Sequence, residues 1–248
     1  MDAPSIAFVT TAALWGAAAG LLVPRAAYRL SVAADEPWRS RCPAGHALAG
    51  PARGWLGGPG RAGCATTPAP FTAPLLTALA CAALAAATGV PRPELLVWLL
   101  AAPFGTLLAC VDVRVHRLPD RLTLPLAVAL PLLLALAALL PYAAGSWTHS
   151  LLGALVLGGG YLLLAMLHPN GMGFGDVKLA VPLGAALGWY GWGVLFAGAF
   201  AGFLLGALYG LGLVVTGRAD RGDAIPFGPF MIVGALLGLL LGAFTALP

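Results

Sequence analysis

Charge is scarce in this chain. Only 9% of its 248 residues are Asp, Glu, Lys or Arg, whereas charged residues make up about 25% of an ordinary soluble domain. Hydrophobic residues make up 60%, and the mean hydropathy is +0.92. This shortage of charge excludes an ordinary soluble domain. The basic residues that remain lie between apolar runs, so we do not expect nucleic acid as a partner.

Several familiar motifs are also missing. The chain has no HExxH motif for zinc and no GxSxG nucleophile elbow. It also lacks the ten-residue stretches of alternating hydrophobicity that are typical of membrane β-barrels. Apolar runs of about 20 residues recur instead, each long enough to cross a hydrocarbon core as a helix. The sequence therefore predicts an all-α, polytopic integral membrane protein that contacts the lipid bilayer.

The apolar runs predict a bundle of about eight transmembrane helices in a single membrane domain, residues 1–248. The run over 179–215 is too long for one span, and the glycines and aromatic residues at 188–193 favour a reversal there. The polar stretch 25–71, after the first span, is expected to be a cytoplasmic loop with little regular structure. The predicted spans are 5–23, 72–90, 94–110, 122–140, 149–167, the two halves of 179–215, and 226–247.

The basic residues are distributed very unevenly between alternate loops. All Lys and Arg except Arg92 fall in one set of loops. By the positive-inside rule, that set is cytoplasmic and both termini lie outside. Asp112 and Asp176 then lie at cytoplasmic ends of spans.

These two acids predict either catalysis or transport. An ionised group at membrane depth costs roughly 2.5 to 3.5 kcal/mol, so a retained acid is a candidate functional residue. Two carboxyls about 3 Å apart cannot both ionise. The charged one can accept a proton from an attacking water while the protonated one donates to a peptide carbonyl. The alternative is a small membrane transporter or channel that uses Asp112 and Asp176 as proton or cation sites.

Three motifs resemble those of the type IV prepilin peptidases. DVRVHRLPDRLTLP at 112–125 is similar to their first active-site motif, GFGDVKL at 173–179 to their GxGD motif, and IPFGPF at 225–230 to the start of their last helix. The resemblance implies a catalytic helical bundle over 72–248 with Asp112 and Asp176 as catalytic aspartates. It also implies cleavage of the basic leader of prepilins or pseudopilins at the cytoplasmic face of the inner membrane. A silent assembly factor is disfavoured because both aspartates are present.

Five further residues are expected to support this site. Asp120, after Pro119, is expected to cap the next helix. Gly173 and Gly175 are expected to be required for backbone shape rather than for direct contact. Lys178 is either an interfacial anchor or an electrostatic partner of Asp176.

The loop departs from the family pattern. Many relatives carry two CxxC pairs there, which suit zinc, and those proteins also methylate the new pilin N-terminus. This chain keeps Cys42, His46 and Cys64, at most three ligands where structural zinc normally has four. We therefore expect no zinc and no S-adenosylmethionine, and the case for N-methylation is weak. The sequence leaves the oligomeric state open.

Overall fold

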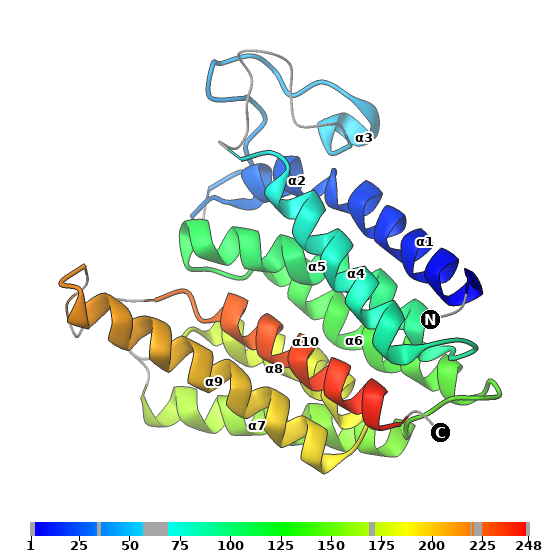
Figure 1. Ribbon diagram of the computed structural model, residues 1–248. Coiled ribbons are helices and arrows are strands. Elements are labelled where there is room, and N and C mark those ends of the chain that lie inside the picture. The colour runs from blue at the N-terminus through cyan, green and yellow to red at the C-terminus, as the bar shows by residue number, and fades with distance from the viewer. Residues whose placement is uncertain are drawn as a thin grey trace. The chain divides into compact units, whose positions relative to one another are not determined.

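Helices make up nearly all the regular structure in the computed structural model, which describes residues 3–33, 36–56, 69–168, 172–218, 220 and 225–246. Within these residues the only bridge between extended segments joins Arg41 and Ala47. In chain order (Figure 1), the helices are α1 (Ala3–Gly20), α2 (Val23–Leu30), α3 (Pro51–Gly54), α4 (Thr72–Thr88), α5 (Glu94–Val115), α6 (Asp120–Ala138), α7 (Trp147–Leu167), α8 (Phe174–Gly188), α9 (Trp192–Val215) and α10 (Gly228–Thr245).

The prediction of an all-helical, multi-pass membrane protein is confirmed. Six segments are long and apolar enough to span a membrane: Ser5–Leu30, Glu94–Val115, Asp120–Ala138, Trp147–Leu167, Trp192–Val215 and Gly228–Thr245. Helix α4 is a shorter apolar helix, and α8 has 15 residues. The run over 179–215 reverses as predicted, because α8 ends at Gly188 and α9 begins at Trp192.

The chain divides into two compact units. The first comprises Met1–Ala86 and Trp98–Val115, and the second comprises Ala87–Val97 and His116–Pro248. In the first unit, a Cβ on Gly16 of α1 would lie 2.6 Å from the Thr77 carbonyl oxygen of α4. The Thr77 hydroxyl donates to the Thr106 hydroxyl on α5 at 3.1 Å, and Trp15 Nε1 donates to the Leu99 carbonyl at 3.0 Å. Close approach and hydrogen bonds therefore join three helices of this unit, as is common where lipid removes the hydrophobic drive for association.

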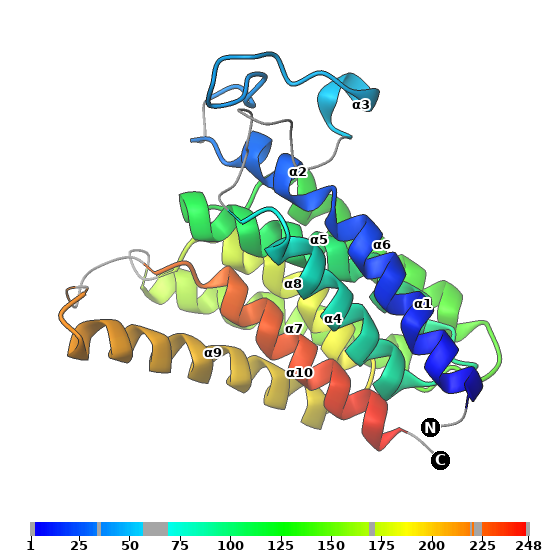
Figure 2. The same cartoon turned by 45° about the horizontal axis from the view of Figure 1, so that its top comes forward.

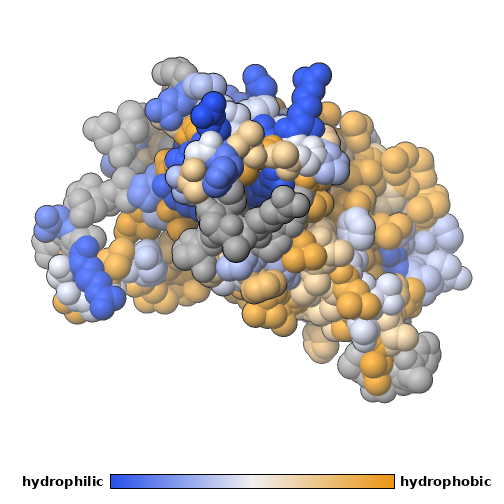
Figure 3. All heavy atoms as spheres, turned by 90° about the horizontal axis from the view of Figure 1, so that it is seen from above, coloured by the Kyte–Doolittle hydropathy of each residue, from blue (hydrophilic) through white to orange (hydrophobic). Residues whose placement is uncertain are grey.

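The stretch 25–71 was predicted to be a loop with little regular structure, and its first residues, up to Leu30, belong to α2. Arg25 and Arg29 are one turn apart and so lie on the same side of the helix. Arg25 Nη2 donates to the Ala49 carbonyl at 2.6 Å, and Arg29 Nη1 donates to the Arg53 carbonyl at 2.9 Å. Both arginine side chains are buried because the loop folds back over them. Figure 3 views the side on which this loop lies and shows hydrophilic residues gathered there.

In the second unit, α7 packs against α8 and α9 against α10. A Cβ on Gly153 of α7 would clash with the backbone of Gly184 on α8, and the Ser150 hydroxyl donates to the Ala185 carbonyl at 2.8 Å. Figures 1 and 2 both show α9 and α10 side by side. The close α7–α8 contact fixes how the two helices align along their length.

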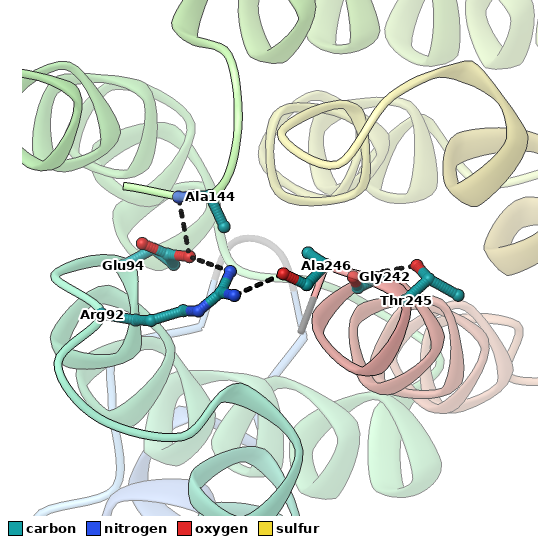
Figure 4. A network of polar contacts seen from close by, with 6 residues as sticks. All are labelled: Arg92, Glu94, Ala144, Gly242, Thr245 and Ala246. Carbon is teal, nitrogen blue, oxygen red and sulfur yellow. Dashed lines mark hydrogen bonds and ion pairs between the residues drawn. The ribbon is translucent and has the colours of Figure 1, made fainter. Parts of the chain in front are cut away.

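A polar network lies at the end of α8 that is far from Asp176 (Figure 4). Glu94 is fully buried, and its Oε1 accepts the Ala144 N–H at 3.3 Å and lies 3.9 Å from Arg92 Nη1. Arg92 Nη2 donates to the Ala246 carbonyl just after α10. Nearby, the Ser146 N–H donates to the carbonyl of Trp189, directly after α8, at 2.9 Å. The ion pair and hydrogen bonds of Arg92 and Glu94 thus connect the start of α5, the end of α10 and the loop before α7.

Candidate active site

Asp112 lies on α5 in the first unit, three residues before the helix ends. Its side chain is only 4% exposed, and the apolar neighbours Leu108 and Val111 on the same helix are fully buried. A carboxyl group in such a setting is costly to keep. The structure thus places Asp112 at a helix end, as predicted, and it buries the side chain.

Asp176 lies in the first turn of α8 in the second unit and is 8% exposed. Gly173 is the N-cap residue, and its carbonyl accepts the Asp176 N–H at 3.0 Å. Negative charge is favoured at this position by the helix dipole. Gly173 has φ −69° and ψ 141°, which any residue can adopt, so the predicted need for glycine backbone shape is wrong there.

Gly175 is needed for close contact instead. A Cβ at this position would lie 3.0 Å from the Leu118 Cβ and 3.4 Å from the Leu118 nitrogen. Leu118 is 3% exposed and begins the Leu-Pro-Asp part of the first motif. The GxGD turn therefore packs directly against a segment that lies almost 60 residues earlier in the chain.

An ion pair makes a second contact between the same two motifs. Lys178 Nζ donates to Asp120 Oδ1 at 2.6 Å across 58 residues of sequence. The predicted capping role of Asp120 is wrong, since Pro119 takes the N-cap position and makes no side-chain capping bond. Asp120 is the first residue of α6 and binds Lys178, whose Nζ also lies 5.0 Å from the centre of the Phe174 ring.

One buried polar residue of α7, Tyr161, was not predicted from the sequence. Tyr161 on α7 is 3% exposed and stacks on Phe203 of α9, with ring centres 5.3 Å apart. Phe227, directly before α10, completes the cluster at 5.1 Å from Phe203 and 6.3 Å from Tyr161. The available signal was a tyrosine in the apolar second half of α7, 12 residues before Gly173.

Two of the three weak zinc candidates come together. Cys42 and His46 close a tight turn in which the Cys42 N–H donates to the His46 carbonyl at 2.9 Å, and Cys42 Sγ lies 3.7 Å from His46 Nδ1. Cys64 lies outside the described residues. In the described part of the chain, no three His, Cys, Asp or Glu side chains converge as a metal site would require. Two ligands do not fit the four that structural zinc normally has.

Comparison with known proteins agrees with the motifs. The model of the type IV leader peptidase family matches residues 95–247. The prepilin leader peptidase/N-methyltransferase of Aeromonas hydrophila is 34% identical over 209 residues, which cover 77% of this chain and 66% of that protein. The protein of the same name from Aeromonas salmonicida (strain A449) is 34% identical over 176 residues, which cover 68% of this chain and 55% of the relative.

A third relative of that name, from Burkholderia pseudomallei (strain 1026b), is 32% identical over 228 residues, which cover 82% of this chain and 67% of the relative. The chain thus spans between about half and two thirds of the length of these curated relatives. No solved structure matches the chain.

Proposed function

Because the chain belongs to the type IV leader peptidase family, we propose that it is a membrane aspartic endopeptidase that removes the leader of a type IV prepilin or pseudopilin. The substrate is a membrane-inserted chain with a short basic leader ahead of an apolar helix. Such a substrate suits an enzyme whose own helices contact lipid and whose acids lie at helix ends.

Asp112 and Asp176 are the proposed catalytic pair. One carboxylate accepts a proton from water as the water attacks the scissile carbonyl carbon, while the other, protonated carboxyl donates to the carbonyl oxygen. The tetrahedral intermediate then collapses: the carboxyl that took the proton from water gives it to the leaving nitrogen, and the C–N bond breaks. The other carboxylate takes back a hydroxyl proton, which releases the leader as an acid and the mature chain as an amine. Burial supports the assignment, since two acids that are at most 8% exposed in an apolar chain are expensive to keep without a function.

The observation that carries the proposal is the contact between the two family motifs within the second unit. Leu118 packs on Gly175, and Asp120 binds Lys178 at 2.6 Å. These residues follow Asp112 and surround Asp176 in sequence. Packing that brings together the segments flanking two acids is what a shared active site needs.

The proposed site faces the cytoplasm, and both termini lie on the opposite side of the inner membrane. The exposed residues Arg114, Arg117 and Arg121 follow Asp112 directly. Such a cluster favours the cytoplasmic side. A leader that has not been cut would lie on that side as well.

The proposal covers cleavage alone. It requires neither zinc nor S-adenosylmethionine, because an acid pair and a water supply every proton and the nucleophile. The relatives are also named for N-methylation. In this chain, however, Cys42 and His46 are only a remnant of the two CxxC pairs that accompany this activity in the family. We therefore propose that the mature N-terminus leaves the enzyme unmethylated.

The test is cleavage of a tagged prepilin in membranes that contain the wild-type chain or Asp112→Asn. The wild-type chain should release a mature product whose mass carries no added methyl group, and Asp112→Asn should leave the precursor intact while still inserting into the membrane. Normal cleavage by the variant would contradict the role of Asp112. If the wild-type chain cuts no prepilin, proton or ion flux becomes the measurement to make.

A further inference from the structure

The register between α7 and α8 places Tyr161 beside the start of α8. On α7, a Cβ on Gly153 would meet Gly184, and a Cβ on Gly158 would lie 2.8 Å from Val181 Cγ2. The helices are antiparallel, so moving one turn further along α7, to Tyr161, moves one turn back along α8, toward Asp176. Tyr161 accordingly lies on the part of α7 that faces the first turn of α8, which holds Asp176.

Two aromatic rings hold the tyrosine ring in place. Phe203 stacks on Tyr161 with 29° between the ring planes, and Phe227 packs against both rings. Phe227 reaches α9 at Gly206, where a Cβ would lie 2.8 Å from Phe227 Cε2. Phe227 belongs to the third family motif, at 225–230, so this motif supports the ring of Tyr161.

The hydroxyl is the only polar atom of this buried side chain. Buried tyrosine hydroxyls usually find a hydrogen-bond partner. The Tyr161 side chain is only 3% exposed, so its hydroxyl has little access to water. The hydroxyl is therefore a hydrogen-bond donor on the part of α7 that faces the start of α8.

We propose that Tyr161 is a positioning residue for Asp176: its hydroxyl donates a hydrogen bond to the Asp176 carboxylate when substrate is bound and fixes the orientation of that carboxylate toward the attacking water. Phe203 and Phe227 act through Tyr161 by fixing its ring. Catalytic hydrogen bonds are often long in the free enzyme and shorten in the complex with substrate. This inference rests on the proposed peptidase function.

The test compares Tyr161→Phe with Tyr209→Phe in steady-state cleavage of a prepilin by the purified full-length chain in lipid. Tyr209 is a matched control because it also packs on a phenylalanine, Phe230, with ring centres 5.2 Å apart, but its side chain is 49% exposed. Tyr161→Phe keeps the stacked ring and removes only the donor. We expect kcat to fall about tenfold to a hundredfold, the factor for one hydrogen bond to a charged group, with KM and thermal stability unchanged. Tyr209→Phe should behave as the wild-type chain.

A second variant tests the coupling. Phe227→Leu should also lower kcat, and adding it to Tyr161→Phe should cause little further loss, because both changes act on one hydrogen bond. If Tyr161→Phe cleaves with the wild-type kcat, or if the two losses multiply, the positioning role is wrong and the peptidase assignment stands. If the wild-type chain itself fails to cleave, the peptidase assignment is wrong and the role of Tyr161 falls with it.

Discussion

The second unit keeps a buried carboxyl at each end of its bundle, and the two are held very differently. Glu94 is fully buried and is bound by the Arg92 guanidinium and the Ala144 N–H. Asp176 is 8% exposed and lies in the first turn of α8, and the neighbouring Lys178 binds Asp120. Glu94, which has a dedicated cation and a backbone donor, therefore has a structural role. Asp176, in a helix-start turn whose Gly175 packs on Leu118, is the acid that we propose for catalysis.

The largest contrast should come from neutralising the acid at the Asp176 end. Asp176→Asn removes a group that exchanges protons with water, so cleavage of a tagged prepilin should fall by at least about 10²-fold. Thermal stability should stay close to that of the wild-type chain, because asparagine has the same shape. A variant that loses stability in parallel with cleavage would mean that Asp176, like Glu94, is structural.

Removing Glu94, at the other end of the bundle, should lower stability and leave the cleavage activity of the folded protein intact. Glu94→Ala leaves the Arg92 side chain, which is 13% exposed, without its counter-charge. Removing one partner of a buried pair costs about 3 kcal/mol or more. Unfolding in detergent should therefore become easier, while the folded fraction should still cleave. Glu94→Gln, which can still accept the Ala144 N–H, should lose less. A Glu94→Ala chain that is stable but cannot cleave would contradict the structural role of Glu94.

A smaller loss of cleavage is expected from adding a methyl group at the contact between Gly175 and Leu118. Gly175→Ala brings a methyl group within 3.0 Å of Leu118 Cβ, so the start of α8 must shift by a few tenths of an ångström. Because misplacement of about 1 Å can cost about 10²-fold in rate, we expect cleavage to fall about tenfold. Gly159→Ala on α7 is the matched control, since a Cβ there meets nothing within 4 Å. Equal cleavage by the two variants would show that the Leu118 contact does not position Asp176.

The smallest effect should come from the exposed ion pair. The Asp120 side chain is 55% exposed and that of Lys178 is 22% exposed, and pairs of this kind contribute about 0 to 1 kcal/mol. Lys178→Ala should leave stability nearly unchanged and lower cleavage by less than about threefold, with a weaker dependence on salt than the wild-type chain shows. A loss of cleavage as large as that of Asp176→Asn would mean that Lys178 is itself one of the reacting groups.

The helices were largely predictable because membrane spans depend on composition and length. The reversal at 188–193 followed from glycine and aromatic residues and agrees with the end of α8 at Gly188. Helix α2 was missed because its arginines indicated a loop. They are buried only because Ala49 and Arg53, more than 20 residues later, return to accept their hydrogen bonds. No local pattern contains that information.

The candidate site was predictable only where a motif names the residue. The motifs identified Asp112 and Asp176 and placed them at helix ends. The partner of Lys178, the contact of Gly175 with Leu118 and the position of Tyr161 depend on the register between helices. Glycines such as Gly153 set that register by allowing backbones to meet. The predicted capping role of Asp120 is wrong because Pro119 takes the N-cap position, and the lysine that binds the Asp120 carboxylate lies on α8.

The central claim is that Asp112 and Asp176 act as one catalytic pair. The most direct measurement is the residual cleavage rate of Asp112→Asn, of Asp176→Asn and of the double variant in the same membranes. Because each change removes the same acid–base pair, the double variant should be no slower than the slower single variant. Losses that multiply, or one single variant that cleaves at the wild-type rate, would contradict a shared site.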